Sequence, residues 1–406
     1  MIINIPENSD FSIHNIPFGI FSTKQLNPRA GVAIGNHILD LVALSELGVF
    51  DFDTSVFKKN TLNDFISLGK PITNKVRTSI QLWISDKNSL ISNKPKLFVL
   101  QSESQMHMPI NVGDYTDFYS SIEHATNVGT MFRDKENPLL PNWKHIPVGY
   151  HGRSSSIIVS KQPVNRPKGQ ILPLNSTQPV FKATERLDFE LEMAFITGKK
   201  SKLGESVSIE NAEDHIFGLV LLNDWSARDI QKWEYVPLGP FLAKSFASSI
   251  SPWIVTLEAL DQFRVSGPDQ NPQVLPYLKY SGKKNYNIKL EVSIRPENCE
   301  EQIIAKSNFK YLYWNMVQQL THQTINGCNI NVGDLYGSGT ISGKTPDSYG
   351  SMLELSWMGT KPIKIKNGSE RKFLNNGDTI TLRGYSQKMG QRVGFGEVVT
   401  KILPAK

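Results

Sequence analysis

Short apolar runs separated by turn residues recur through the first hundred residues of the chain, for example at 18–21, 31–34 and 38–42. Runs of this length, bounded by glycine, proline and polar residues, are typical of β-strands. A more helical pattern covers residues 62–91, and residues 96–100 are again strand-like. The polar residues that follow indicate a linker near residues 102–112. We therefore predict a small, mostly β domain over residues 1–106.

Further strand-like segments dominate the rest of the chain. They lie at residues 155–159, 187–196, 216–222, 253–257, 287–294, 361–365, 379–382 and 393–399. Gly169, Gly282 and Gly377 stand in turn-like sequences between them, where glycine suits a positive φ. Because turns rather than regularly spaced helices separate these segments, we expect a closed or rolled sheet over residues 107–406 instead of alternating βαβ units.

Composition favours two packed domains in solution. The 406 residues, of which 39% are hydrophobic, exceed one ordinary core of about 100–150 residues. The longest apolar stretch, residues 216–222, is far shorter than the roughly 20 residues that cross a bilayer, and no basic and apolar leader opens the sequence. The two cysteines, Cys299 and Cys328, exclude a disulfide framework and a four-cysteine zinc site. We expect a cytoplasmic protein with no membrane partner.

The positive charge of the chain is local. The net charge is +6, and residues 357–406 hold ten Lys and Arg against three Asp and Glu. Lys361, Lys364, Lys366 and Arg383 are scattered through strand-like sequence and are not clustered with stacking aromatic residues. A solvated sheet face accounts for this pattern, so we expect no nucleic-acid partner.

Acidic residues alternate along one predicted strand. Successive side chains of a strand point to opposite faces, so Asp188, Glu190 and Glu192 share one face. Three like charges on one face repel one another, and the face must either be open to water or hold a cation. The pattern alone leaves both interpretations open.

Two more acids lie in informative positions. Asp224 follows the apolar run 216–222, where it is equally suited to capping a following helix or to binding a ligand. Asp117 and His124 lie in a stretch that could be helical with Gly129 as its end, and seven residues are nearly two helical turns, so both would face the same way. Because no cluster of histidine and cysteine is found, any metal must be held by oxygen atoms, which selects calcium, magnesium or manganese over zinc.

Several ordered motifs together resemble the fumarylacetoacetase family, and the resemblance covers nearly the whole chain. The motifs lie at residues 10–17, 31–35, 114–121, 124–129, 141–143, 147–153, 188–192 and 351–357. The resemblance implies a small SH3-like N-terminal barrel joined to a larger mixed β-roll of the C-terminal fumarylacetoacetase type, acting as a homodimer. It also implies hydrolysis of the carbon–carbon bond of fumarylacetoacetate, a diketo dicarboxylate, at the end of tyrosine and phenylalanine breakdown.

The resemblance assigns two metal sites. Asp117, Glu190, Glu192 and Asp224 match the ligands of a calcium-type cation, Ca²⁺. A second, magnesium-type site for Mg²⁺ matches Asp224, Lys244 and Ser248, and Mn²⁺ is an alternative cation. Ala247-Ser248 stands where the family pattern leads us to expect Gly-Thr: serine keeps the hydroxyl, but alanine restricts the backbone at the second site.

The resemblance also assigns catalytic and substrate-binding residues. His124 matches a general base that Glu354 orients, and a neutral imidazole held by a carboxylate suits the activation of water. Positive and polar groups must then stabilise the oxyanion formed by attack on the carbonyl. The matching oxyanion donors are Arg228, Gln231 and Lys244. The residues that match substrate contacts are Tyr119, Arg133, Tyr150, Gln231, Tyr235 and Thr340.

Two other hypotheses stay open. A hydrolase of the same superfamily that acts on an acylpyruvate or another 1,3-diketo acid would use the same chemistry. The two-domain length and the set Tyr119, Arg133 and Tyr150 favour the fumarylacetoacetase type over it. A non-catalytic calcium-binding scaffold would need the acids but neither His124 nor Glu354, so these two residues distinguish an enzyme from a scaffold.

Overall fold

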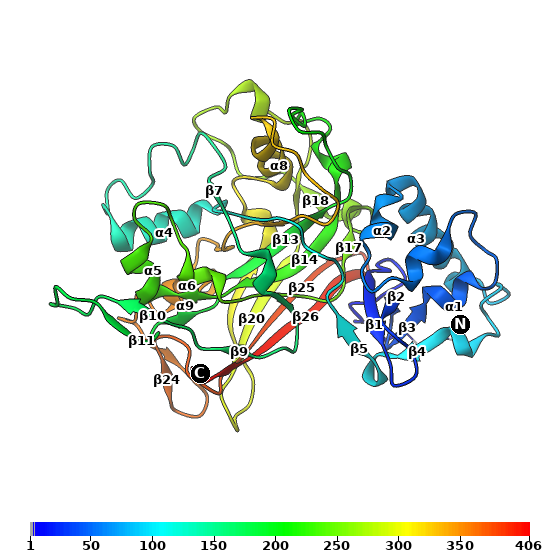
Figure 1. The fold of residues 1–406 in the computed structure, drawn as a ribbon, viewed down its shortest axis with the longest axis horizontal. Coiled ribbons are helices and arrows are strands. Elements are labelled where there is room, and N and C mark those ends of the chain that lie inside the picture. Colours follow the sequence, from blue (N-terminus) through cyan, green and yellow to red (C-terminus); the bar gives the residue numbers. More distant parts are fainter. Residues whose placement is uncertain (1–2, 4) are drawn as a thin grey trace.

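The computed structural model describes residues 3 and 5–406. Figure 1 shows a smaller N-terminal part, coloured blue to cyan, beside a larger part that holds the rest of the chain. Antiparallel strand pairs dominate both parts, and short helices pack around their sheets. The mostly β fold class predicted from the pattern is confirmed. Every helix in the described chain is too short or too polar to span a bilayer.

Five antiparallel strands form the N-terminal sheet, in the order β4-β3-β2-β1-β5. The strands are β1 (Phe18–Ser22), β2 (Arg29–Ile34), β3 (His37–Asp40), β4 (Phe98–Leu100) and β5 (Gln105–His107), and the helices are α1 (Leu41–Ser45), α2 (Asn63–Ser67) and α3 (Lys70–Ser85). Phe18, Ile20 and Val32 are fully buried between the sheet and these helices. The arrangement agrees with the predicted SH3-like barrel.

Two expectations for this part were wrong in detail. Residues 41–42 are helical, because the side chain of Asp40 ends β3 and caps α1 by accepting hydrogen bonds from the amides of Val42 (2.9 Å) and Ala43 (3.3 Å). The helical stretch 62–91 is two helices that end at Ser85. Gly69, with a φ of 87°, separates them in a conformation that favours glycine.

Two sheets form the larger part. The eight-stranded sheet has the order β7-β6-β22-β13-β14-β16-β8, with β17 also paired to β14, and the five-stranded sheet has the order β21-β20-β25-β26-β9. Leu221, Leu290, Leu382 and Val398 come from both sheets and share one buried core. The strands of the first sheet are β6 (Tyr115–Phe118), β7 (Gly149–His151), β8 (Ile157–Val159), β13 (Leu191–Thr197), β14 (Ile216–Asp224), β16 (Ser248–Ile250), β17 (Val255–Thr256) and β22 (Leu335–Gly337). Those of the second are β9 (Val164–Asn165), β20 (Lys289–Arg295), β21 (Gln302–Asn308), β25 (Thr379–Lys388) and β26 (Gln391–Leu403).

Smaller elements surround these sheets. Four two-stranded pairs are β10 (Lys168–Ile171) with β11 (Val180–Ala183), β12 (Leu187–Asp188) with β15 (Ser226–Ala227), β18 (Arg264–Val265) with β19 (Asn285–Tyr286), and β23 (Ile363–Lys364) with β24 (Glu370–Arg371). The helices are α4 (Ile122–Phe132), α5 (Arg228–Glu234), α6 (Leu242–Ser245), α7 (Leu257–Leu260), α8 (Met316–Thr324) and α9 (Met352–Leu355). Short 3-10 helices are η1 (Thr54–Lys58), η2 (Pro95–Leu97), η3 (Gln101–Glu103), η4 (Ser154–Ser156), η5 (Ala212–His215), η6 (Asp261–Phe263), η7 (Pro276–Leu278), η8 (Phe309–Tyr311) and η9 (Pro346–Ser348).

The predicted strands are present, but several lengths differ. Of residues 253–257 and 361–365 only the two-residue strands β17 and β23 form, whereas β25 and β26 extend well beyond residues 379–382 and 393–399. Gly282 and Gly377 have the expected positive φ, 76° and 87°. Gly169 does not: it lies in β10, where a Cβ would approach Ile230 Cδ1 of α5 to 2.7 Å, so close packing rather than a turn requires glycine.

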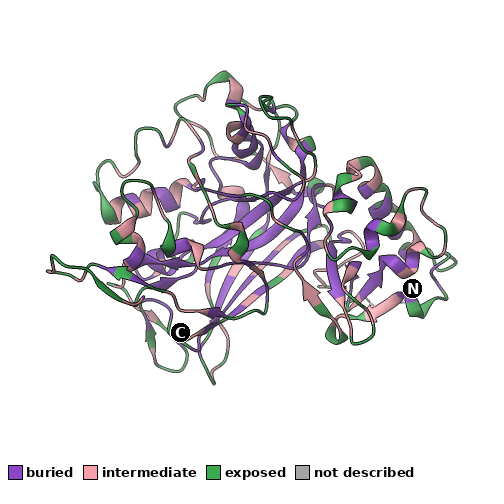
Figure 2. Ribbon diagram, in the orientation of Figure 1, coloured by how far each residue is buried: buried purple, intermediate pink, exposed green. Residues whose placement is uncertain are grey.

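The two parts share a buried core. The backbone of Phe18 in β1 pairs with Ile254, with N···O distances of 3.0 and 2.8 Å. Phe217 and Leu222 of β14 pack in the same apolar cluster as the N-terminal residues. Figure 2 shows buried residues along the central strands and in the N-terminal sheet. The expected boundary between residues 106 and 107 falls inside β5 and stays a prediction.

Candidate active site

Four buried carboxylates meet on the eight-stranded sheet, and we call Asp117, Glu190, Glu192 and Asp224 the acid cluster. Asp117 lies in β6, Glu190 just before β13, Glu192 in β13 and Asp224 at the end of β14. One oxygen atom of each lies within 4.8 Å of those of the other three. The strand order β6-β22-β13-β14 explains the convergence, because residues far apart in sequence lie on neighbouring strands.

Strand β22 lies between two of these acids, and its glycine leaves them room. A Cβ on Gly337 would lie 2.6 Å from Asp117 Oδ1 and 3.1 Å from Glu192 Oε2. The amide of Gly339 donates to the same two oxygens, at 3.2 and 3.0 Å. The backbone of this segment therefore holds the two carboxyl groups side by side.

Nearby basic side chains do not balance the four carboxylates of the acid cluster. Burial raises the pKa of Asp117 and of Glu192 well above their ordinary values, and neighbouring carboxylates increase both shifts. Within the described residues, Glu192 Oε1 is buried without a hydrogen-bond partner. Buried carboxylates are paired or coordinate a metal. The donor set consists of oxygen atoms and fits a hard divalent cation such as Ca²⁺, Mg²⁺ or Mn²⁺.

Two basic side chains lie on one side of the acid cluster. Lys244 of α6 donates to Glu190 Oε2 and, at 2.6 Å, to Asp224 Oδ2. Arg228 of α5 donates to Glu190 Oε1 at 2.7 Å. Burial opposes the charge of Glu190, but Lys244 and Arg228 outweigh it and lower the pKa of this carboxyl. Glu190 therefore stays ionised between two cations.

Asp224 accepts two further hydrogen bonds. Ser248 donates to Asp224 Oδ1 at 2.9 Å, and the Tyr150 hydroxyl donates to Asp224 Oδ2 at 3.1 Å. Lys244, Ser248 and Asp224 thus lie together, as the resemblance implied for a second metal site. The ammonium and the hydroxyl act here as hydrogen-bond donors, and the second site stays a prediction.

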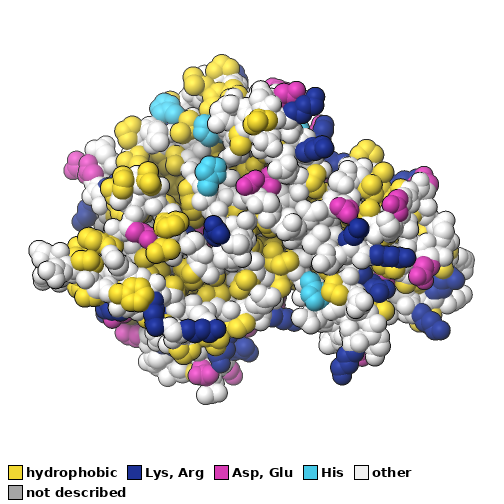
Figure 3. Space-filling view, in the orientation of Figure 1, with side chains coloured by type: hydrophobic (Ala, Val, Ile, Leu, Met, Phe, Trp, Pro, Cys, Tyr) yellow, Lys and Arg dark blue, Asp and Glu magenta, His cyan; other side chains and the backbone are white. Residues whose placement is uncertain are grey.

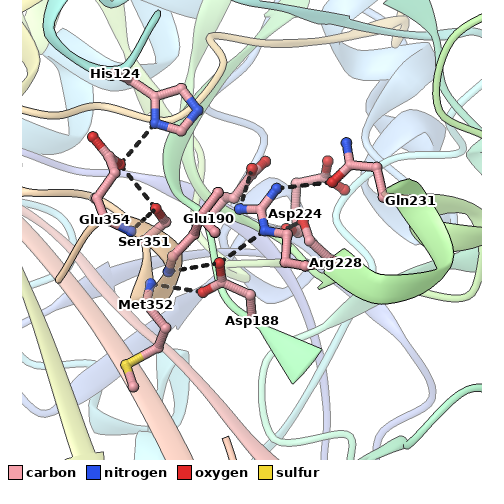
Figure 4. Close-up of polar contacts among 12 residues, drawn as sticks. His124, Asp188, Glu190, Asp224, Arg228, Gln231, Ser351, Met352 and Glu354 are labelled. Carbon is pink, nitrogen blue, oxygen red and sulfur yellow. Dashed lines mark hydrogen bonds and ion pairs between the residues drawn. The ribbon is translucent and has the colours of Figure 1, made fainter. Parts of the chain in front are cut away.

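His124 and Glu354 form a buried pair beside the acid cluster. His124 lies in the first turn of α4, where Ser121 caps the helix, and Glu354 lies in α9. The distance from His124 Nδ1 to Glu354 Oε2 is 2.7 Å. Figure 4 shows the second ring nitrogen pointing away from the carboxylate. With Nδ1 hydrogen-bonded to Glu354, that nitrogen, Nε2, is left to accept a proton.

Three side chains besides His124 hold Glu354. Asn127 donates to Oε1 at 2.8 Å, Ser351 donates to Oε2 at 2.8 Å, and Ser342 lies 2.9 Å from both oxygens. Burial opposes the charge of Glu354, but His124 and these donors lower its pKa. The ionised glutamate is therefore fixed in one orientation, and it fixes the imidazole ring.

The remaining predicted residues are distributed unevenly around the site. The Tyr119 ring lies edge-on to His124, with ring centres 5.3 Å apart, and Thr340 is buried with its hydroxyl unpaired among the described residues. Gln231 accepts from Arg228 Nη1 at 3.1 Å. Arg133 is exposed at the end of α4 and donates to the Pro138 carbonyl at 3.0 Å, and Tyr235 is also exposed. Burial raises the pKa of Tyr119 and the nearby Arg133 guanidinium partly offsets this rise, so Arg133 lies close to the Tyr119 hydroxyl although it is itself exposed. The structure thus brings Tyr119 to His124 and Arg133 to Tyr119, and it leaves Tyr235 outside the buried network.

Three sequence interpretations were wrong. Asp117 and His124 do not share a helix: Asp117 lies in β6, and α4 begins at Ile122 and continues past Gly129 to Phe132. Gly129 is needed for packing, since a Cβ there would lie 1.9 Å from the Pro138 carbonyl oxygen. The acidic face of residues 188–192 is fully buried, so the interpretation as a solvated outer face is excluded.

Asp224 and Asp188 also differ from expectation. Helix α5 begins at Arg228 after Ala227, so Asp224 is not its cap. Asp188 shares the alternation of Glu190 and Glu192, yet it lies outside the acid cluster. The strand is interrupted between β12 and β13, and the Asp188 carboxylate accepts from Arg228 Nε at 2.8 Å.

The sequence did not identify two residues that hold Glu354. Asn127 lies three positions after His124, one helical turn away, and this spacing could have indicated a shared target. Ser342 lies in a loop after β22 and has no such signal, because its position depends on a strand pairing that no local pattern fixes.

Comparison with known proteins gives consistent results. Two family profiles match, one described as fumarylacetoacetase N-terminal over residues 14–109 and one as fumarylacetoacetate (FAA) hydrolase C-terminal over residues 115–402. Fumarylacetoacetase of Homo sapiens is 52% identical over 412 residues, covering 99% of this chain and 98% of its own. That of Dictyostelium discoideum is 53% identical over 416 residues, covering 99% and 97%.

Solved structures share the fold at low sequence identity. A fumarylacetoacetate hydrolase from Exiguobacterium antarcticum has a TM-score of 0.54 and 18% identity, covering 96% of this chain and 100% of that chain. A maleylpyruvate hydrolase from Sphingobium sp. SYK-6, solved in complex with manganese(II) ion and pyruvate, has a TM-score of 0.51 and 15% identity, with coverage of 96% and 100%. These two likenesses concern the fold alone.

Proposed function

Because this chain belongs to the fumarylacetoacetase family, we propose that its buried site hydrolyses the carbon–carbon bond of fumarylacetoacetate to fumarate and acetoacetate. Identity of about half the residues over 99% of the chain to named fumarylacetoacetases supports this hydrolase activity and its place in tyrosine breakdown. The strongest support for an enzyme is the pair His124–Glu354, which lies beside Glu190, Arg228 and Lys244. A non-catalytic scaffold that only binds an ion would need no such pair.

A divalent cation belongs in the acid cluster. Asp117, Glu190, Glu192 and Asp224 would hold it, and the unpartnered Glu192 Oε1 supports this assignment. When bound, the cation would act as a Lewis acid on the diketone oxygens. Four carboxylates favour Ca²⁺, whereas Mn²⁺ is the ion named for the maleylpyruvate hydrolase of the same fold. The magnesium-type site at Asp224, Lys244 and Ser248 stays part of the proposal.

His124 starts the reaction as a general base. Its Nε2 takes a proton from water while the water oxygen forms a bond to the carbonyl carbon of the fumaryl group. The Glu354 carboxylate, 2.7 Å from Nδ1, stabilises the imidazolium that results. Burial of both side chains keeps this charge pair away from bulk water.

Arg228, Lys244 and Gln231 face the negative charge that develops. Attack on the carbonyl produces an oxyanion, which guanidinium, ammonium and amide groups stabilise by hydrogen bonds. The carbon–carbon bond then breaks, and its electron pair stays on acetoacetate as an enolate. The imidazolium of His124 returns its proton to the enolate carbon, so the reaction consumes one water and leaves the enzyme unchanged.

The substrate is held by residues around this centre. We assign Tyr119, Tyr150 and Thr340 to its keto and carboxylate oxygens, because Tyr119 contacts His124, Tyr150 contacts Asp224 and the Thr340 hydroxyl lacks a partner among the described residues. Arg133 and Tyr235, which are exposed, are assigned to the outer end of the substrate.

The assembly and compartment are also proposals. We infer a cytoplasmic homodimer from the family resemblance. Exposed apolar side chains on the connection between α5 and α6 support burial by a second copy, with Val236 66%, Leu238 95% and Phe241 69% exposed. Figure 3 shows hydrophobic side chains gathered on this side of the molecule. The molar mass in light scattering tests the dimer, and a monomer mass contradicts it.

The proposed function is tested by following the ultraviolet absorbance of fumarylacetoacetate during incubation with the protein. We expect the absorbance to be lost with metal present, to persist after treatment with a chelator, and to be lost again when a divalent cation is restored. A stable absorbance in every condition contradicts the activity, and loss that a chelator leaves unchanged contradicts the metal.

A further inference from the structure

Asp188 is the one acid of the alternating strand that lies outside the acid cluster, although it is fully buried. It ends β12, and its two oxygens accept three hydrogen bonds from two separate elements. Arg228 Nε of α5 donates to Oδ2 at 2.8 Å. The amides of Met352 and Leu353 in α9 donate to Oδ1 and Oδ2, at 2.7 and 3.0 Å.

On one side, Asp188 completes the set of partners of Arg228. Nε is bound to Asp188, Nη2 to Glu190 at 2.7 Å, and Nη1 to Gln231 at 3.1 Å. A planar guanidinium with three bonded nitrogens cannot turn about its long axis without breaking bonds. Asp188 thus fixes the plane of the arginine that we assign to the oxyanion.

On the other side, Asp188 fixes the backbone that carries Glu354. Met352 and Leu353 immediately precede Glu354 in α9, and Asp188 binds their amide groups directly. Their side chains take no part in these bonds. Figure 4 shows Asp188 between Arg228 and this backbone, with Glu354 and His124 following in one continuous chain of contacts.

We propose that Asp188 is a positioning residue that holds the oxyanion-binding arginine and the glutamate of the base pair in a fixed mutual geometry. The inference rests on the proposed function. Attack and oxyanion stabilisation must occur around one carbonyl, so the base and the arginine have to be placed relative to each other. A misplacement of about 1 Å can reduce turnover about 100-fold.

The test compares Asp188→Asn with a matched control, Asp378→Asn. Asp378 is also buried and is bonded in the same way, to Arg371 Nε (2.9 Å) and Nη2 (3.0 Å) and to the amide of Asn375 (2.8 Å), but none of these partners belongs to the site. Both variants lose a buried charge pair, so both should unfold more easily. Only Asp188→Asn should lower kcat for fumarylacetoacetate, by about 100-fold, with KM changed by less than about 3-fold.

A double-mutant cycle with His124→Ala gives a second readout. If Asp188 acts through the base pair, Asp188→Asn should reduce kcat by less than about 10-fold in the His124→Ala background, because the base it positions is already gone. A purely structural aspartate would show the full loss in both backgrounds. A kcat for Asp188→Asn within about 3-fold of the wild type, or a full additive loss in the cycle, overturns the proposal.

If Asp188→Asn does not fold, Met352→Pro and Met352→Ala replace it. Proline is tolerated at the first position of a helix and removes the amide that donates to Asp188, while alanine removes the same side chain and keeps the amide. The proposal predicts a lower kcat for the proline variant than for the alanine variant, and equal values overturn it. Wild-type protein without activity on fumarylacetoacetate would instead refute the proposed function, so the two failures are distinguishable.

Discussion

Replacing Glu354 with glutamine tests the proposal that Glu354 orients His124 as the general base. Glu354 is 1% exposed, and both of its oxygens accept hydrogen bonds from His124, Asn127, Ser342 and Ser351. A glutamine presents an NH₂ group in place of one oxygen, so it faces a donor whichever way it is turned. It also removes the negative charge that stabilises the imidazolium. We expect kcat to fall by about 100- to 10,000-fold, the usual contribution of a general base.

The same variant should be less stable near neutral pH. A hydrogen bond to a charged group contributes about 1.5–3 kcal/mol, and the lost Glu354–His124 contact is of this kind. The pKa of Glu354 is lowered in the folded protein, so its carboxylate contributes stability above the unfolded pKa of about 4.3. That contribution is lost as the pH falls through the folded pKa. The wild type and the variant should therefore converge in unfolding free energy below about pH 4.

Urea unfolding at several pH values and steady-state turnover of fumarylacetoacetate measure both effects. Near-ultraviolet circular dichroism controls for a retained fold. A Glu354→Gln variant with wild-type kcat would refute the orientation of the base. A stability difference that is independent of pH would refute the assignment of an ionised glutamate in the buried pair.

Three further predictions concern metal and substrate. Glu192→Gln should lose bound divalent cation and activity together, because a neutral amide replaces a carboxylate ligand. Elemental analysis after desalting measures the metal content, and undiminished metal with full activity would remove Glu192 from the site. Gly337→Ala should also lower the metal content, since the Cβ of the alanine would lie 2.6 Å from Asp117 Oδ1. Metal binding equal to that of the wild type would show that the strands can shift without a loss of metal affinity. Arg133→Lys should weaken kcat/KM for fumarylacetoacetate by about 1.5–3 kcal/mol and much less for a diketone without the terminal carboxylate. Equal losses on both substrates would favour the acylpyruvate hydrolase hypothesis.

Local pattern predicted the elements of the fold better than their lengths. The strands of residues 216–222 and 287–294 follow from apolar runs with clear ends, and both are present, whereas residues 187–196 form two strands, β12 and β13. The two-residue strand β17 pairs with β14, far away in sequence, whereas β23 pairs with the neighbouring β24, and the apolar runs themselves fix neither length. Asp40 shows the opposite case, in which one side chain ends a strand and begins a helix.

The acid cluster could be predicted only in part. The period-two spacing of Glu190 and Glu192 indicated a shared face, and this pair does meet in the structure. Asp117 joins them through the parallel pairing of β6 with β22, and no local pattern encodes that pairing. Asp188 leaves the group because its carboxylate binds Arg228, 40 positions further on. The motif resemblance supplied what spacing alone did not, the partnership of His124 and Glu354.

In the proposed reaction His124 removes the proton from water next to a cation-holding acid cluster, and the variant His124→Ala takes away this base alone. The measurement is kcat for fumarylacetoacetate in wild type and variant, with metal content and circular dichroism recorded on the same samples. We predict a loss of about 100- to 10,000-fold in kcat with unchanged metal and fold. A variant that keeps kcat within about 3-fold of the wild type, at equal metal content, would show that His124 is not the general base.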